Sequence, residues 1–284
     1  MSIQKIGIVG AGAMGTGIAH VAAQSGFDVK VFDEFAPAKE KSLATIQKLS
    51  SSAVEKGKQT NEERQQMLSR LQYVDSLQEM SDRDLIIEAI IEIFDAKIAL
   101  HKQLDVILPA NAIIATNTSS MSITAIAAAT KRPDKFAGMH FFNPAQVMKL
   151  VEVIRGLNSS DETINTLKDL SVKMGKVPVE VKRDTPGFIV NRLFLPQMRE
   201  AVKILEEGIA SIEDIDTAMK LGLNHPMGPF TLMDFTGIDI HYHVLDYYRR
   251  EMGDAYLPPL LLKQMVQAGR LGKKSGQGWY DYSK

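Results

Sequence analysis

The chain has 284 residues, of which 45% are hydrophobic and 24% are charged, with 33 basic and 34 acidic side chains and a formal net charge of −1. This balance gives no electrostatic reason to expect nucleic acid or an anionic membrane as a partner, and the length favours two domains over one. The absence of cysteine excludes disulfides, thiolate metal sites and cysteine nucleophiles, and it suits a reducing cytoplasm.

No part of the sequence has the pattern of a membrane segment. Every apolar run is shorter than the roughly 18 uninterrupted residues that a membrane span needs. The apolar run from Ile3 to Val9 is also too short for a secretory signal, and glycines follow it instead of a cleavage site. We therefore expect a cytoplasmic protein with no membrane partner.

The first motif along the chain is a glycine-rich loop between a strand and a helix. Lys5 to Val9 predicts a short buried strand, residues 18–23 have the apolar spacing of a helix, and residues 28–32 predict a second strand that ends at Asp33. This order of strand, loop, helix, strand and acid is typical of a dinucleotide-binding unit. The loop residues predicted to bind the dinucleotide are Gly10, Ala11, Gly12, Ala13, Met14 and Gly15.

Each glycine of this loop has a separate physical task. Gly10 makes the tight turn, Gly12 lets the backbone approach the pyrophosphate, and Gly15 lets the helix lie close to the sheet. The helix N-terminus then binds the phosphates. Asp33 can accept both ribose hydroxyls of NAD, whereas the 2′-phosphate of NADP would meet like charge at Asp33 and Glu34. The sequence therefore favours NAD over NADP.

Strands and helices continue to alternate after this unit. We expect helices over residues 36–57 and 94–108, and strands over residues 85–90 and 112–116. The pattern predicts a Rossmann-type, doubly wound and mainly parallel sheet in an α/β fold. Residues 116–120 follow the last of these strands, at the edge where open α/β sheets bind ligands. An ordinary polar loop with a helix N-cap explains them equally well.

One histidine and one glutamate stand out further along the chain. Residues 136–140 predict a buried strand that ends at His140, Asn143-Pro144 predicts a turn, and residues 149–154 predict the next strand, with Glu152 inside it. Neighbouring strands can bring the two side chains within hydrogen-bond reach, where the carboxylate fixes the imidazole tautomer and favours its protonated form. Oxidation of an alcohol by a nicotinamide needs such a group, because the hydroxyl proton must leave as hydride departs. Taken singly, each residue is more often an ordinary strand residue, and the pair gains weight from the loop that precedes it.

Near residue 184 the pattern becomes helical. Helices are predicted over residues 188–207, from a cap at Ser211, over residues 231–251 and over residues 258–268. Asp214 and Asp216 lie near the positive end of the helix that Ser211 caps. We divide the chain into an NAD-binding domain over residues 1–184 and an all-α domain over residues 185–284. The helical domain is too apolar to hide all of its own surface, so we expect a homodimer through it.

The remaining titratable residues give weaker signals. Five lysines are scattered along the helix that follows Asp33 and beyond its end, and a solvated helix face explains them most simply. The alternative is that Lys56 or Lys58 binds a phosphate-bearing part of a substrate. The histidines other than His140 show no metal-ligand spacing with acidic partners, so we expect no metal.

Taken together, these residues resemble the 3-hydroxyacyl-CoA dehydrogenase family, in particular its short bacterial 3-hydroxybutyryl-CoA dehydrogenases, over nearly the whole chain. The motifs that carry the resemblance stand in order along the sequence. They are residues 10–15 (GAGAMG), 88–92 (EAIIE), 116–120 (TNTSS), 140–152 (from His140 to Glu152), 185–192 (TPGFIVNR), 224–229 (NHPMGP) and 273–280 (KKSGQGWY).

The resemblance implies a role for each matching residue. His140 would be the general acid and base, Glu152 would orient it, and Ser119 and Asn191 would hydrogen-bond the reacting oxygen of an acyl-CoA substrate. Lys56 falls near a coenzyme A contact of the family. The positions that match dinucleotide contacts are Glu92, Lys97, Ser119, Asn143 and Lys274. The family usually has proline or a smaller residue at Gln146 and phenylalanine at Trp279, and these differences bear on packing or acyl-chain preference.

Three other functions are compatible with parts of this pattern. A longer-chain 3-hydroxyacyl-CoA dehydrogenase would share every motif, because pocket shape sets chain length. A 6-phosphogluconate-type dehydrogenase would use a catalytic lysine, and the His140–Glu152 pair argues against it. A catalytically silent, crystallin-like dinucleotide-binding protein would not need His140, Glu152, Ser119 and Asn191 all to be present.

Overall fold

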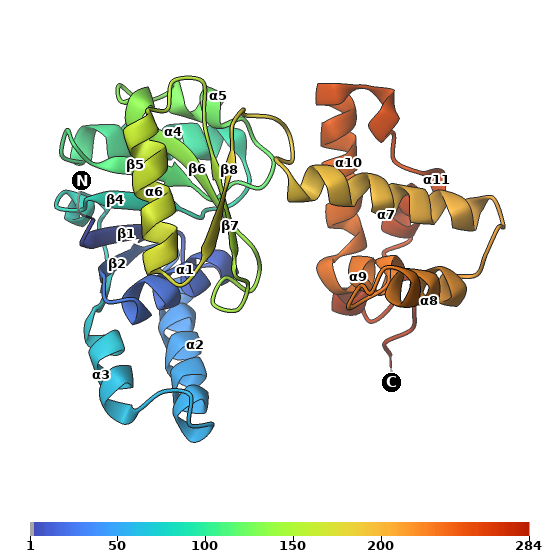
Figure 1. Cartoon of the computed structure of the whole chain (residues 1–284), viewed down its shortest axis with the longest axis horizontal. Coiled ribbons are helices and arrows are strands. Elements are labelled where there is room, and N and C mark those ends of the chain that lie inside the picture. Colours follow the sequence, from blue (N-terminus) through green and yellow to red (C-terminus); the bar gives the residue numbers. More distant parts are fainter. Residues whose placement is uncertain (1–2, 284) are drawn as a thin grey trace. The chain divides into compact units, whose positions relative to one another are not determined.

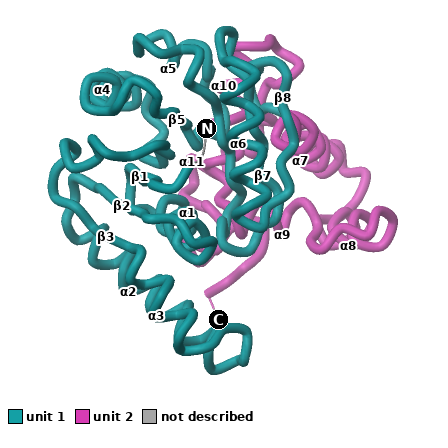
Figure 2. Tube along the Cα trace, turned by 60° about the vertical axis from the view of Figure 1, so that its left-hand side comes forward, with its two compact units in different colours: residues 1–188 teal, residues 189–284 magenta. Residues whose placement is uncertain are grey.

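The computed structural model describes residues 3–283. The chain divides into two compact units, Met1–Phe188 and Ile189–Lys284, coloured separately in Figure 2. The division lies a few residues beyond the boundary predicted from the sequence. Within residues 3–283, no helix is both long and apolar enough to cross a membrane.

The first unit contains an eight-stranded sheet with the order β3-β2-β1-β4-β5-β6-β7-β8. All neighbouring strands run parallel except β6 and β7, which are antiparallel. The predicted doubly wound, mainly parallel sheet is therefore confirmed. Its strands are β1 (Lys5–Val9), β2 (Asp28–Phe32), β3 (Leu71–Val74), β4 (Leu85–Glu88), β5 (Ile113–Thr116), β6 (Phe136–Phe141), β7 (Leu150–Ile154) and β8 (Val177–Val181).

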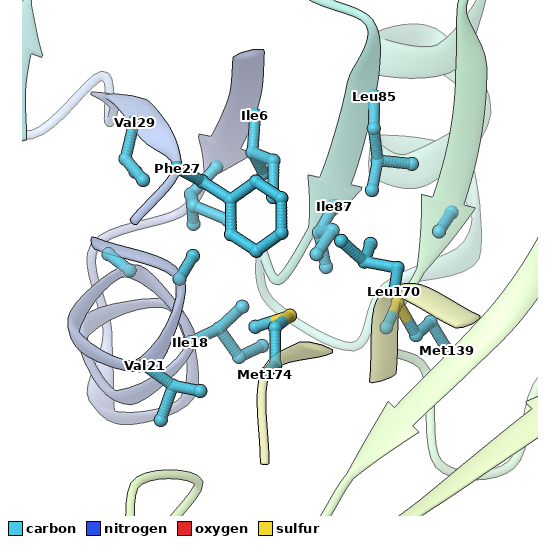
Figure 3. Close-up of a cluster of buried hydrophobic side chains, with 14 of the residues drawn as sticks. Ile6, Ile18, Val21, Phe27, Val29, Leu85, Ile87, Met139, Leu170 and Met174 are labelled. Carbon is cyan, nitrogen blue, oxygen red and sulfur yellow. The ribbon is translucent and has the colours of Figure 1, made fainter. Parts of the chain in front are cut away.

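Helices cover both faces of this sheet, as Figure 1 shows. They are α1 (Ala13–Gln24), α2 (Ala36–Glu55), α3 (Asn61–Ser69), α4 (Phe94–Ile107), α5 (Ile123–Ala127) and α6 (Asp161–Lys173), with short 3₁₀ turns η1 (Leu77–Met80) and η2 (Pro133–Lys135). Successive strand residues point to opposite faces, so Ile6 and Ile87 pack with α1 and α6, and Ile86 packs with α4 and α5. Figure 3 shows the first of these cores, in which Ile18 and Leu170 approach the side chains of the strands. Both faces are covered by buried apolar side chains, as is usual for a parallel sheet.

The strand order reverses between β1 and β4, because the chain winds outward from β1 in one direction and from β4 in the other. In open α/β sheets, ligands bind outside the carboxyl ends of the strands at such a switch point. The glycine loop follows β1 directly, and Glu88 is the last residue of β4. The topology therefore places both at the edge where a ligand is expected.

The second unit is helical, as predicted. Its helices are α7 (Val190–Glu206), α8 (Ile212–Gly222), α9 (Pro229–Thr236), α10 (Ile238–Met252) and α11 (Leu260–Gln267), with 3₁₀ turns η3 (Asp254–Tyr256) and η4 (Lys273–Ser275). The prediction of one helix over residues 231–251 was wrong. Gly237 has a φ of 108°, which no helix accommodates, and it separates α9 from α10. Helix α7 begins later than predicted because Phe188, at a φ of 51°, is left-handed.

Two buried aspartates tie distant segments of the helical unit together. The N-cap at Ser211 is confirmed, since its side chain accepts the Asp214 amide. Asp216, predicted to complement the helix dipole, is instead buried and accepts hydrogen bonds from the Phe230 amide, from the amide and hydroxyl of Thr231, and from the Tyr280 hydroxyl. Asp234 likewise accepts the amides of residues 279 and 280. These two carboxylates hold the C-terminal segment against α8 and α9.

Candidate active site

The glycine loop has the geometry that its spacing predicts. Gly10 has a φ of 107°, and a Cβ there would lie 2.4 Å from the carbonyl oxygen of Ala89. A Cβ at Gly15 would lie 1.8 Å from the carbonyl oxygen of Gly10, so neither position can carry a side chain without a backbone shift. At Gly12, by contrast, a Cβ would meet no atom within 4 Å. Gly10 and Gly15 serve the internal packing, and Gly12 leaves the loop open to a ligand.

A cavity of about 570 Å³ opens next to this loop, at the carboxyl ends of β1, β2 and β4. Its volume falls in the range of small-molecule sites, roughly 300–1,000 Å³. It is lined by Val9, Gly10, Gly12, Phe32, Asp33, Glu34, Phe35, Leu77, Ala89, Ile90, Ile91, Ala96, Ala99, Leu100 and Gln103. A second cavity of about 530 Å³ shares Gly12 and Phe35 with the first and includes Asn143 and Gln146 in its lining.

Asp33 braces the loop and also faces the first cavity. One carboxylate oxygen accepts the Ala11 amide at 2.7 Å, and the other accepts the Phe35 amide at 2.8 Å. Each oxygen has a second lone pair, so the carboxylate can still accept a hydroxyl from a ligand. An open loop backbone, a helix N-terminus and a free acceptor at the end of β2 fit the pyrophosphate and ribose of a dinucleotide.

The antiparallel pairing of β6 with β7 brings His140 and Glu152 together. The two residues are direct partners in the register, and Nδ1 of the imidazole lies 2.8 Å from Oε2 of the carboxylate. Both are buried, with 6% of His140 and 1% of Glu152 exposed. The rings of Phe142 and Phe188 lie 4.5 and 5.7 Å from the imidazole ring.

The other imidazole nitrogen of His140 is the one left for chemistry. With Nδ1 on the carboxylate, the hydrogen bond fixes the tautomer and orientation of the ring. Nε2 lies on the side of the ring away from this carboxylate. The arrangement can therefore exchange a proton at Nε2 while Glu152 faces the opposite side of the ring.

Ser119 lies in the loop after β5, and Glu92 holds that loop. The Glu92 carboxylate accepts a hydrogen bond from the Thr118 hydroxyl and another from the Ser119 amide, the latter at 3.0 Å. The other oxygen of Glu92 lies 3.1 Å from the Lys97 ammonium. The structure thus brings together three residues that the sequence assigned to the site, Glu92, Lys97 and Ser119.

A buried charge cluster around Glu88 was not predicted from the sequence. Glu88, Lys97 and His101 are all almost inaccessible to solvent, and the Glu88 carboxylate lies 2.6 Å from the Lys97 ammonium and 3.2 Å from the His101 ring. Burial alone raises the pKa of Glu88. The hydrogen bond to His101 and the charge of Lys97 outweigh it and lower that pKa to about 2. The i,i+4 spacing of Lys97 and His101, which places both on one face of α4, was the available signal.

The other predicted site residues lie elsewhere. Lys56 is exposed at the C-terminal end of α2, and Asn143 is exposed after β6, at the edge of the second cavity. Asn191 in the first turn of α7 and Lys274 in η4 belong to the helical unit. The Lys274 ammonium pairs there with Asp239 at 2.6 Å. The roles of these residues stay predictions.

Comparison with known families agrees with this geometry. Residues 5–185 match the NAD binding domain of 3-hydroxyacyl-CoA dehydrogenase, and residues 187–282 match its C-terminal domain. Both parts of the chain are therefore accounted for by one family.

Individual relatives match over nearly all of this chain. A probable 3-hydroxybutyryl-CoA dehydrogenase of Bacillus subtilis is 47% identical over 285 residues, covering 100% of this chain and 99% of the relative. The 3-hydroxyadipyl-CoA dehydrogenase of Escherichia coli is 43% identical over 286 residues, covering 99% of this chain and 60% of the relative. The crystal structure of (S)-3-hydroxybutyryl-CoA dehydrogenase from Ralstonia eutropha has 45% identity and a TM-score of 0.97, with 100% of both chains covered. The chain belongs to the 3-hydroxyacyl-CoA dehydrogenase family and is an NAD-dependent oxidoreductase of that family.

Proposed function

We propose that the protein is an (S)-3-hydroxybutyryl-CoA dehydrogenase, which interconverts acetoacetyl-CoA and 3-hydroxybutyryl-CoA in butyrate, butanol or fatty-acid metabolism. The observation that carries the proposal is the buried hydrogen bond between His140 and Glu152, 2.8 Å long, in a chain with an open glycine loop. The names of the full-length relatives from Bacillus and Ralstonia support the four-carbon substrate.

His140 would exchange the substrate proton. NAD, when bound, would supply the acceptor for the hydride from C3 of the substrate, and NADH would supply the donor in the reverse direction. In oxidation, Nε2 of His140 takes the proton of the C3 hydroxyl as the C3–H bond breaks and the carbonyl forms. In reduction, the same nitrogen donates a proton to the C3 oxygen. Glu152 accepts the hydrogen bond from Nδ1 throughout and stabilises the imidazolium after proton uptake.

The polar residues around the reacting oxygen complete the proposed site. Ser119 and Asn191 would donate hydrogen bonds to the C3 oxygen and so stabilise the charge that develops on it. Lys56, at the exposed end of α2, would bind a phosphate of coenzyme A. Asp33, Glu92, Asn143 and Lys274 would contact the dinucleotide. The buried ammonium of Lys97 would contribute to dinucleotide binding while it stays paired with Glu88 and Glu92.

The helical unit would form a homodimer. Several large apolar side chains of this unit are exposed, and such surface is usually covered by a partner. They include Leu193, Ile209, Leu221, Phe235 and Leu260. Sedimentation of the protein at micromolar concentration would show twice the chain mass, whereas a monomeric mass would contradict the dimer. We also propose a cytoplasmic location, on the cysteine-free composition.

The activity is tested by following NADH oxidation with acetoacetyl-CoA. We expect turnover with NADH and a much lower kcat/KM with NADPH, because Asp33 and Glu34 repel a 2′-phosphate. A parallel assay compares kcat/KM on four-carbon and ten-carbon 3-ketoacyl-CoA substrates. A higher value on the ten-carbon substrate would make the protein a longer-chain enzyme, and no turnover on either would leave a silent dinucleotide-binding protein.

A further inference from the structure

Glu88 occupies an unusual position for a carboxylate. It ends β4, is 0% exposed, and receives hydrogen bonds from four groups. Oε1 accepts the Ile90 amide at 2.8 Å and the Lys97 ammonium at 2.6 Å. Oε2 accepts the Thr116 hydroxyl at 2.7 Å and faces the His101 ring nitrogen at 3.2 Å. The carboxylate is therefore saturated by the protein and does not line either of the two cavities beside the glycine loop, so it is not a group for substrate chemistry.

The network around Glu88 leads to the loop that carries Ser119. From Glu88 the Lys97 ammonium bridges to Glu92 at 3.1 Å. Glu92 in turn accepts the Thr118 hydroxyl and, at 3.0 Å, the Ser119 amide. Two carboxylates and one ammonium thus connect the end of β4 with the backbone of Ser119.

Stability alone does not account for this cluster. Removing charges from water is costly, and well-packed apolar side chains in place of a buried ion pair are often as stable or more so. Ile90, Ile91 and Ala96, which lie between Glu88 and Lys97 in the sequence, line the cavity of about 570 Å³. The cluster therefore lies directly behind the wall of the dinucleotide cavity, where it can fix the geometry of that wall.

We propose that Glu88 is a positioning residue for the dehydrogenase reaction, which fixes the backbone at Ser119 through Lys97 and Glu92. This inference rests on the proposed function. Glu88 touches neither the cofactor cavity nor the substrate. Its charge holds Lys97, Lys97 holds Glu92, and Glu92 sets the place of the Ser119 amide and hence of its hydroxyl.

The test is a double-mutant cycle on kcat/KM for acetoacetyl-CoA with saturating NADH. Glu88→Gln keeps the size of the side chain and removes the charge that holds Lys97. We expect this variant to lose roughly 10- to 100-fold in kcat/KM, the cost of a small misplacement of a reacting group. In a Ser119→Ala background, the same substitution should cost less than about 3-fold, because the residue through which it acts is gone.

Two results would overturn the inference. Equal losses from Glu88→Gln with and without Ser119 would show that Glu88 acts independently of the loop. An unchanged kcat/KM in Glu88→Gln would show that the cluster serves only the fold. If Glu88→Gln does not fold, Thr116→Val removes one donor to the same carboxylate and should show a smaller loss with the same dependence on Ser119.

Asp105→Asn is the matched control. Asp105 is a partly buried carboxylate on the same helix, α4, and its side chain accepts a hydrogen bond from Arg132 at 2.7 Å. Breaking this pair should lower stability and leave kcat/KM within about 3-fold of wild type, since Asp105 lies in the last turn of α4, whereas Lys97 lies in its first turn. An inactive wild-type enzyme would refute the proposed function. An active wild type in which Glu88→Gln costs the same kcat/KM with and without Ser119 would refute the inference alone.

Discussion

Buried carboxylates have different partners in the two units of the molecule. In the sheet-containing unit, Glu152 binds a histidine, and Glu88 binds a lysine and a histidine as well as neutral donors. In the helical unit, Asp216 and Asp234 bind backbone amides together with the hydroxyls of Thr231 and Tyr280. None of the hydrogen-bond partners in that second set changes charge near neutral pH.

This difference separates two uses of a buried carboxylate. A carboxylate paired with an ionisable side chain favours the protonated form of that side chain and fixes its orientation. Such a pair can therefore take part in proton transfer. A carboxylate paired with amides closes segments that are distant in sequence and supports the fold. Substitutions in the first unit should therefore affect turnover most, and those in the second unit should affect stability most.

The largest effect is expected at His140. His140→Ala removes the group that exchanges the substrate proton, and kcat should fall by roughly 10²–10⁴-fold with little change in NADH affinity. Steady-state NADH oxidation with acetoacetyl-CoA gives kcat, and NADH fluorescence titration gives the affinity. His243→Ala, which changes an exposed histidine of α10, is the control and should retain wild-type turnover.

Glu152→Gln should have the next largest effect. The amide keeps the size of the side chain but no longer stabilises the imidazolium and no longer imposes one tautomer, so we expect kcat to fall roughly 10- to 10³-fold. The melting temperature of the variant should stay close to that of the wild type. Wild-type turnover in this variant would show that the hydrogen bond is only structural.

Acid should destabilise the first unit through Glu88. Because the pKa of Glu88 is lowered from 4.5 to about 2, the ionised carboxylate stabilises the folded state above pH 4.5, and that stability is lost as the pH falls toward 2. The loss is on the order of 3 kcal/mol for one group. Urea unfolding at several pH values in this range measures it. A Glu88→Gln protein with the same acid sensitivity as wild type would assign the loss to other groups.

Asp216→Asn should change stability and leave turnover nearly intact. In the wild type, the Asp216 carboxylate accepts backbone amides. In the variant, the side-chain NH₂ group would face one of these donors, and the free energy of unfolding should fall by roughly 2–3 kcal/mol. Trp279 is the single tryptophan and lies in the helical unit, so its fluorescence during urea unfolding reports that unit. A fall in kcat as large as the one at Glu152 would place Asp216 in the chemistry and erase the distinction between the units.

The parts of the fold that sequence could predict were those set by local pattern. The glycine loop needs specific residues at fixed spacing, and Gly10 and Gly15 have the close contacts that this spacing implies. The pairing of His140 with Glu152 followed from two apolar runs joined by a turn. Strand β8 was not predicted although valines alternate along it, because Pro178 lies within the run and a proline there argues against a strand.

The rest depended on contacts between residues far apart in the chain. The side-chain partners of Glu88 lie 9, 13 and 28 residues away, and no local pattern predicts that they meet at Glu88. Around Gly237, apolar residues continue at helical spacing on both sides, so the break between α9 and α10 is set by the backbone and not by hydrophobicity. Asp216 was read as a helix-end charge because its partners at residues 230, 231 and 280 follow later in the chain.

Proton transfer at His140 is tested most directly by a single turnover. Enzyme loaded with one equivalent of NADH is mixed with excess acetoacetyl-CoA, and the decay of NADH absorbance is followed for wild type and His140→Ala. The account predicts a decay roughly 10²–10⁴-fold slower in the variant, with NADH still bound at the start. An equally fast decay in both proteins would show that the proton comes from another group.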